Sequence, residues 1–98
     1  MDDEELVDFA KDFRSGILGD RMPTLACFMV CFPLVGLLKA SNVVVELVDS
    51  DLGWINHFWI RLGDGRALDP TADQFNYLDN ANFPPVYLGK RTKYHISK

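Results

Sequence analysis

The sequence predicts an α+β fold in which N-terminal helices pack on an antiparallel sheet. Two apolar segments with helical spacing come first, over residues 3–15 and 25–40. Runs of β-branched and aromatic residues, separated by glycine, follow from residue 42 onward. Helices followed by strands are typical of α+β proteins. The chain has 98 residues, 48% of them hydrophobic, which is enough for one core, so we expect residues 1–98 to form a single domain.

The first helix is expected over residues 3–15, because acidic residues fill its first turn and Gly16 and Gly19 follow it. Its apolar positions are Leu6, Val7, Phe9, Ala10 and Phe13. The second helix is expected over residues 25–40, with Thr24 as its N-cap. Because this segment is apolar on nearly every side, we expect a buried central helix.

Strands are expected over residues 42–49, 54–62 and 66–69, with short closing strands over residues 86–88 and 94–96. The first run, NVVVELVD, is apolar enough to indicate burial on both faces. Residues 70–85 mix Asp and Asn with aromatic residues and prolines, and we expect an ordered loop there.

Composition and charge exclude several classes of protein. The net charge of −4 argues against a nucleic-acid partner bound through its phosphates. The acidic N-terminus lacks the cationic region of a signal peptide. The apolar run over residues 25–38 is too short for a membrane span and contains Pro33 and Gly36. We therefore expect a cytoplasmic protein with no membrane partner.

The two cysteines, Cys27 and Cys31, lie one helical turn apart, which suits a disulfide poorly, so we expect free thiols in a reducing cytosol. Together with His57 and His95 they offer four zinc-binding atoms, but this spacing matches no zinc motif. We expect no metal and no cofactor. His95 lies near the C-terminus and is expected at the surface.

A predicted hairpin brings His57 and Asp69 together. The loop over residues 63–65 holds two glycines, and three-residue hairpin loops place their last residue in the left-handed region. This loop puts Trp59 opposite Asp69, so His57 and Asp69 become diagonal neighbours on one face, roughly 7–8 Å apart at Cα. A two-residue loop would turn Asp69 to the other face.

Cys27, His57 and Asp69, in that order, supply the groups of a thiol-dependent acyl-transfer site. A helix N-terminus beside a histidine lowers the pKa of a thiol, and Cys27 would lie in the first turn of the second helix. His57 would accept the thiol proton and return it to the leaving group, and Asp69 would fix the tautomer of the ring. The backbone N–H of Cys27 is a candidate oxyanion donor.

Each of these residues also has a structural explanation, because free cysteine is commonly buried and an aspartate before proline commonly forms a turn. A lone histidine in a strand is commonly structural as well. Cys31 is a rival nucleophile, since a helix restarting at Pro33 would place Cys31 just before its first turn. We favour Cys27.

These residues resemble the transglutaminase-like, papain-like cysteine protein superfamily, especially its small bacterial and phage-type members. In that superfamily a cysteine begins a helix, His-x-Trp follows on a strand, and Asp-Pro-Thr closes the next strand. The matching segments are Cys27, His57-Phe58-Trp59 and Leu68-Asp69-Pro70-Thr71-Ala72-Asp73-Gln74-Phe75, with Leu34, Leu37 and Leu38 where the family helix carries leucine. The resemblance spans about residues 24–89. It implies a papain-like minimal core with Cys27 as nucleophile, His57 as base and Asp69 as the orienting acid.

Two features depart from the superfamily pattern. Gly-Gln or Gly-Asn commonly precedes the family cysteine, whereas Leu25-Ala26 precede it here, and Pro33 lies inside the cysteine helix. The leading hypothesis is cysteine-dependent acyl transfer on a protein or peptide substrate: amide or thioester hydrolysis, deamidation or transamidation by a cysteine peptidase, amidase or transglutaminase-like enzyme. The alternative is a catalytically inactive papain-like fold that binds a protein through exposed aromatic residues, namely Phe75, Tyr77, Phe83 and Tyr87. A third possibility is a toxin or effector domain that modifies a glutamine.

Overall fold

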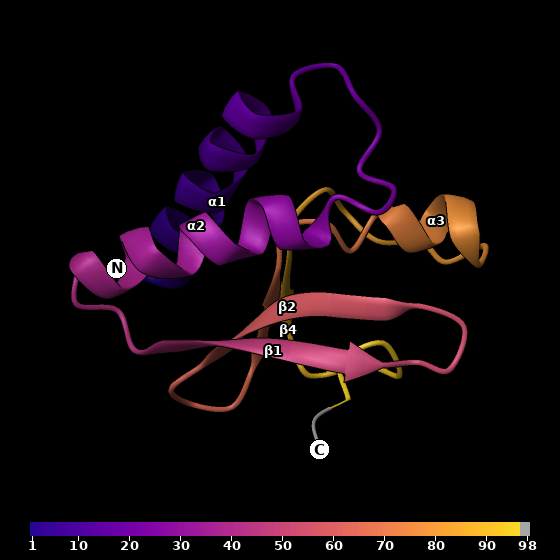
Figure 1. The fold of residues 1–98 in the computed structure, drawn as a ribbon. Helices are drawn as coiled ribbons and strands as arrows, with labels where there is room; N and C mark the ends of the chain where they lie inside the picture. Colours follow the sequence, from indigo (N-terminus) through magenta and orange to yellow (C-terminus); the bar gives the residue numbers. More distant parts are fainter. Residues whose placement is uncertain (97–98) are drawn as a thin grey trace.

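The computed structural model describes residues 1–96 and has an α+β fold (Figure 1). Two N-terminal helices pack on a four-stranded antiparallel sheet of order β1-β2-β3-β4. The elements are α1 (Asp3–Leu18), α2 (Cys27–Ala40), β1 (Val45–Asp51), β2 (Asn56–Leu62), β3 (Ala67–Asp69), α3 (Gln74–Leu78) and β4 (Tyr87–Gly89). Among the described residues, no helix is long and apolar enough to cross a membrane.

Helix α1 begins with a capping box, in which Asp2 accepts from the backbone of Glu5 and Glu5 accepts from the backbone of Asp2. It then continues through Gly16, so the expectation that Gly16 ends the helix is wrong. Gly16 lowers the helical propensity of the segment but does not end the helix, and it lies on an exposed side of α1. Gly19 ends the helix with a positive φ of 57°, and its N–H donates to Ser15.

Helix α2 begins at Cys27, two residues later than expected, and its N-cap is Ala26 instead of Thr24. A turn closed by the Ala26 N–H and the Pro23 carbonyl precedes it. Leu25 in this turn has φ +61°, a conformation that costs an L-residue roughly 1–2 kcal/mol. The helix runs on through Pro33 to Ala40.

The expectation that α2 is a buried central helix is wrong. One side of it is buried, by Cys27, Val30, Cys31, Leu34, Val35 and Leu38. The other side leaves large apolar side chains exposed: Phe28, Met29, Phe32 and Leu37. Residues 1–96 form a single sheet, and α1 and α2 lie together on one side of it, so no second layer of described residues covers the outer side of α2 (Figure 1).

The predicted hairpin register is confirmed. Ile60 pairs with Leu68 and Arg61 with Ala67. The loop closes with a hydrogen bond from the Leu62 N–H to the Arg66 carbonyl, and Gly65 has φ +91°. Strand β1 runs over residues 45–51 instead of 42–49. Among the strands of residues 1–96 it pairs with β2 alone, because it lies at the edge of the sheet.

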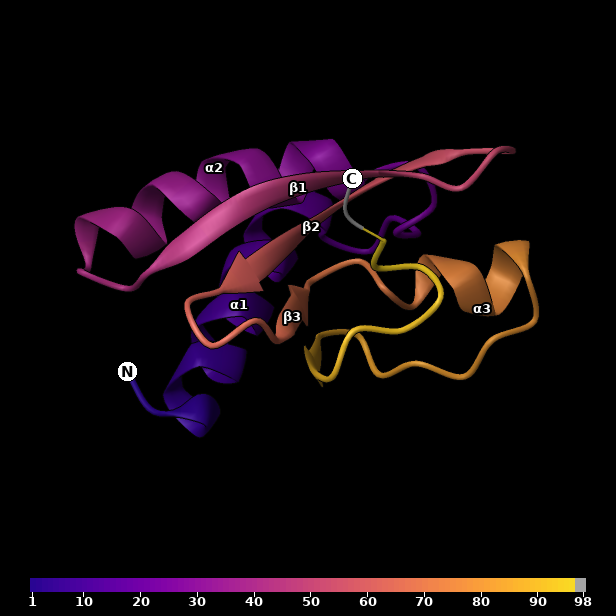
Figure 2. The ribbon, with the colours of Figure 1, turned by 90° about the horizontal axis from the view of Figure 1, so that it is seen from below.

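The two faces of the sheet have different partners. Ile60, Leu62 and Leu68 pack against α1 and α2 in the main core. Trp59, Val48 and Ala67 point to the opposite face and form a smaller cluster with Tyr87. The C-terminal segment crosses this second face, seen in yellow in Figure 2, and it places His95 against the Trp59 ring at a centroid distance of 5.1 Å. Residues 94–96 of this segment form no strand in the described structure, so that prediction is wrong.

The expected loop over residues 70–85 contains the short helix α3. Arg14 of α1 fastens the segment by donating to both carboxylate oxygens of Asp73, at 2.6 and 2.7 Å, and to the Pro70 carbonyl. This bidentate pair is partly buried. It holds the start of α3 near the first turn of α2, as Figure 1 shows.

Candidate active site

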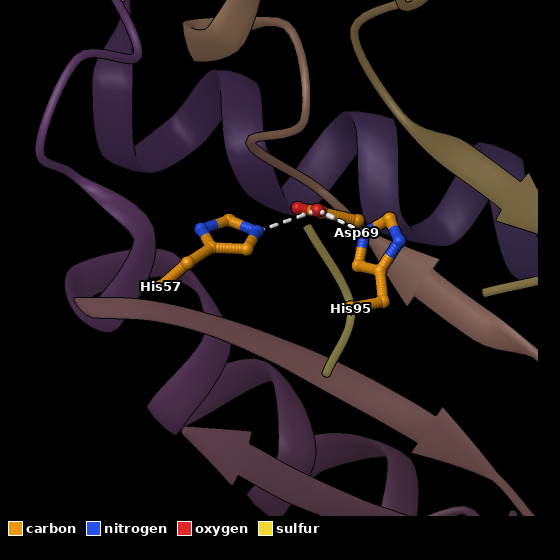
Figure 3. Close-up of side chains that lie close together, drawn as sticks. All are labelled: His57, Asp69 and His95. Atoms are coloured by element: carbon orange, nitrogen blue, oxygen red, sulfur yellow. Dashed lines mark hydrogen bonds and ion pairs between the residues drawn. The ribbon is translucent and has the colours of Figure 1, made fainter. Parts of the chain in front are cut away.

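His57 and Asp69 meet as the register requires. The Nε2 atom of His57 lies 2.6 Å from Oδ2 of Asp69, and both side chains are completely buried (Figure 3). His57 lies near the start of β2 and Asp69 at the end of β3, on the sheet face opposite the helices. The start of β2 lies near the N-terminal end of α2 (Figure 1), and the His57 side chain interacts with Cys27 in the first turn of that helix.

Asp69 is held as a carboxylate by three hydrogen-bond donors. Oδ1 accepts from the Thr71 N–H at 3.1 Å, and Oδ2 accepts from both His57 and His95. Burial acts to raise the pKa of Asp69, but the His57 charge and the hydrogen bonds from both histidines outweigh it and hold the pKa well below its usual range. Asp69 therefore carries a fixed negative charge beside the His57 ring.

The same neighbours act on His57 in the opposite direction. Burial lowers the pKa of His57, whereas the Asp69 charge, the Asp69 hydrogen bond and the interaction with Cys27 raise it, to about 9 overall. The ring is thus a stronger base than a histidine in water. Phe75 packs edge-on against it at a centroid distance of 4.7 Å and restricts its orientation.

Cys27 occupies the first position of α2, where the helix dipole favours a negative charge. It is 6% exposed. Burial raises the pKa of its thiol, but the hydrogen-bonding interaction with His57 and the Phe58 backbone lower it, and the net pKa lies below the ordinary value. Cys27 therefore combines a lowered pKa with a neighbouring base.

Cys31 has the opposite environment. It is fully buried in the main core, and its sulfur lies 3.4 Å from the Phe58 carbonyl. Burial, together with the negative charges of Asp69 and Cys27, raises the pKa of Cys31 well above the ordinary value. Both cysteines are free thiols. Of the two, Cys27 alone has the environment of a nucleophile.

Gln74 is a site residue that the sequence reasoning missed. Its Oε1 accepts from the Leu25 N–H at 3.0 Å, which directs its Nε2 to Nδ1 of His57, 3.1 Å away. The fully buried amide thus links the turn before Cys27 to Nδ1 of the imidazole. Gln74 lies within the Asp-Pro-Thr segment, but sequence alone does not say which way its side chain points.

His95 is the second residue that was missed, and the expectation that it lies at the surface is wrong. It is 2% exposed, and its Nε2 lies 2.7 Å from Oδ2 of Asp69. Figure 3 shows the two rings approaching the carboxylate from opposite sides. Proximity to the C-terminus misled the prediction, because the C-terminal segment packs on the sheet instead of fraying.

The ligand atoms of His57, Asp69 and His95 lie within 4.8 Å of one another, a separation that a metal ion could bridge. The hydrogen bonds around the rings do not suit that use. The Thr92 N–H donates to Nδ1 of His95, and the Gln74 amide faces Nδ1 of His57. Each neutral ring then carries its proton on Nε2, the atom that would have to bind the metal. The three side chains are therefore better described as two histidine N–H groups that donate to one carboxylate than as the ligands of a metal.

The aromatic surface expected over residues 75–87 does not form. Phe75 is completely buried, and Phe83 and Tyr87 are half-buried, so only Tyr77 is well exposed. Two surface pockets, of about 240 and 250 Å³, lie elsewhere, and neither is lined by Cys27 or His57.

Comparison of the chain with family models, with curated protein sequences and with solved structures finds no match in any of the three. Function therefore has to be argued from the site itself.

Proposed function

We propose that this chain is a cysteine-dependent acyl-transfer enzyme with a papain-like minimal core. The observation that carries the proposal is the position of the His57 ring, which hydrogen-bonds Asp69 through Nε2 and faces Cys27 at the start of a helix. A nucleophile, a base and an orienting acid in this order are the parts of a triad, which is recognised by geometry and roles.

In the first step the Cys27 sulfur attacks the carbonyl carbon of an amide or thioester. The thiol proton passes to Nδ1 of His57, where it displaces the hydrogen bond from the Gln74 amide, and the ring then gives the proton to the departing amine or thiol. An acyl group remains on Cys27 as a thioester. Water or an amine then attacks this thioester, loses a proton to His57 and releases the thiol. Asp69 stabilises the positive ring between the two proton transfers.

The negative oxygen of the tetrahedral intermediate needs hydrogen-bond donors. The backbone N–H of Cys27 is one candidate, because first-turn amides have no partner within a helix. Such donors typically contribute several kcal/mol, about 3 each, to the transition state.

We propose a protein or peptide substrate, with no nucleic-acid or membrane partner. Leu25 and Phe28, on either side of Cys27 in the sequence, are exposed and offer apolar contacts to an extended peptide beside the thiol. A reactive free thiol works in a reducing compartment, which agrees with a cytoplasmic location.

Rapid-quench mass spectrometry with 4-nitrophenyl acetate and a peptide thioester tests this function. We expect a burst of leaving group and an acyl group on Cys27. Cys31→Ala should retain the burst, whereas Cys27→Ala should abolish it and His57→Ala should slow it about 100-fold or more. Acylation of Cys27 no faster than in the urea-unfolded chain would contradict the proposal.

A non-catalytic protein-binding module is the second candidate, and the outer side of α2 favours it. Phe28, Met29 and Phe32 are 47%, 51% and 59% exposed, and Leu25 before the helix is 69% exposed. Phe28, Met29 and Phe32 lie on one side of the helix, and the Phe28 and Phe32 rings stack at a centroid distance of 5.2 Å. The same acylation experiment separates the two candidates, because fast acylation of Cys27 is expected of the enzyme and not of a binding module.

A further inference from the structure

We propose that His95 is a positioning residue for the candidate site: as a fixed Nε2–H donor to Oδ2 of Asp69, it sets the proton affinity of His57. Its effect on thiol chemistry rests on the proposed function. The inference depends on three features of the structure: what holds the His95 ring, what that ring donates, and how Asp69 divides its oxygen between two partners.

The first feature is the tautomer of His95. Its Nδ1 lies 3.1 Å from the Thr92 N and 2.9 Å from Thr92 Oγ1. A backbone N–H can only donate, so Nδ1 must accept and the proton of the neutral ring lies on Nε2. The Tyr94 N–H donates to Thr92 Oγ1 at 3.2 Å, which leaves that hydroxyl free to donate to His95 as well.

The second feature is the packing that keeps the ring in place. The Tyr87 ring lies parallel to the His95 ring, with a centroid distance of 5.6 Å and an interplanar angle of 5°. Trp59 meets it edge-on at 5.1 Å, and Phe83 at 6.4 Å. With an exposure of only 2%, His95 cannot exchange its Asp69 hydrogen bond for water without moving these neighbours.

The third feature is the shared oxygen. Oδ2 of Asp69 accepts hydrogen bonds from Nε2 of His57 at 2.6 Å and from Nε2 of His95 at 2.7 Å, so the two donors compete for the same negative charge. Removing His95 leaves the carboxylate with one donor fewer. A neutral His57 would then face a poorly solvated anion, whereas a protonated His57 would neutralise it. Loss of His95 therefore favours the protonated ring.

Titratable side chains meet this cluster from several elements: Cys27 and Cys31 from α2, His57 from β2, Asp69 from β3, Tyr87 from β4 and His95 from the C-terminal segment. Both cysteines add negative charge only when ionised, which also favours a protonated His57. Among the described neighbours of Asp69, His95 is thus the group whose donating atom is fixed by a backbone N–H, that of Thr92.

The test combines NMR of the intact protein with two substitutions. In the unaltered chain, long-range ¹H–¹⁵N spectra at neutral pH should show His95 as the Nε2–H tautomer. In His95→Leu, the titration of His57 should move upward by about one pH unit. His95→Gln places an amide N–H near the position of Nε2, and should return the His57 titration close to that of the unaltered chain.

Two results would overturn the inference: an Nδ1–H tautomer for His95, or equal His57 titrations in the unaltered chain and His95→Leu. The tautomer is read without any substitution, so it stays decisive even if His95→Leu fails to fold. These readouts do not require enzymatic activity. An inert Cys27 with the expected His57 shift would reject the proposed function and keep the role of His95, and a reactive Cys27 without the shift would do the reverse.

Discussion

Replacing Asp69 by Asn exchanges one acceptor for a donor at the centre of a completely buried hydrogen-bond cluster. The asparagine oxygen would keep the Thr71 N–H, which leaves its NH₂ group facing Nε2–H of both His57 and His95. Each buried donor left without an acceptor costs about 1–3 kcal/mol. Both rings would have to change tautomer to relieve this, against Gln74 on one side and Thr92 on the other.

The pKa of His57 gives an independent magnitude. A rise from 6.5 to about 9 corresponds to about 3 kcal/mol of stability, since each unit is worth about 1.4 kcal/mol. A raised pKa stabilises the folded state below pH 6.5, and this contribution is lost as the pH rises through about 9. The lowered pKa of Asp69 contributes above about pH 4, its ordinary value, and is lost as the pH falls. The two windows overlap between about pH 4 and 6.5.

We therefore expect Asp69→Asn to lower the free energy of unfolding by about 3–4 kcal/mol at pH 5.5, and by less at pH 9. Urea unfolding followed by circular dichroism measures this, with Asp69→Asn compared with the unaltered chain at each pH. Asp49→Asn, at an exposed position of β1, is the matched control and should change little. A loss below about 1 kcal/mol, or one that does not depend on pH, would refute the reasoning.

Three further predictions concern stability and the choice of cysteine. Gly65→Ala should lower the free energy of unfolding in urea by about 1–2 kcal/mol, because the φ of Gly65 is +91°. Gly16→Ala in α1 should raise it by about 0.5–1 kcal/mol, because alanine favours the helix and its Cβ meets no neighbour. The same change in free energy for both variants would contradict the turn geometry. Leu25→Gly should leave the Tm unchanged or higher, and Leu25→Val should lower it, because φ is +61°; a Tm lowered only by glycine would argue against that conformation. Cys31→Ala should cost about 1 kcal/mol of core packing and leave alkylation of Cys27 unchanged. A fast-reacting label found by mass spectrometry on Cys31 of the unaltered chain, and lost in Cys31→Ala, would make Cys31 the nucleophile.

The part of the site that could be predicted from sequence is the part determined locally. The glycine turn over residues 63–65 sets the hairpin register, and alternation along the strands then puts His57 and Asp69 on one face. The start of α2 was misplaced by two residues, because the backbone turn before Cys27 caps the helix without a side-chain cap from Thr24.

The rest of the site depends on contacts between distant segments. His95 reaches Asp69 across 26 residues, and no periodicity in the sequence encodes such an approach. The direction of the Gln74 side chain likewise follows from the Leu25 N–H, 49 residues away. The exposure of α2 was missed for a related reason. The apolar pattern of a helix does not reveal how many layers of structure will cover it, and the described residues supply one sheet on one side of α2.

The central claim is that His57 and the start of α2 activate the Cys27 thiol. The most direct measurement is the rate of iodoacetamide alkylation at Cys27 as a function of pH, read by peptide mass spectrometry beside a free cysteine peptide. The account predicts that Cys27 reacts faster than the peptide at pH 7, that its rate reaches a plateau below the peptide's pKa of about 8.5, and that His57→Ala abolishes both features. A Cys27 rate no faster than the peptide's, or one unchanged by His57→Ala, would contradict it.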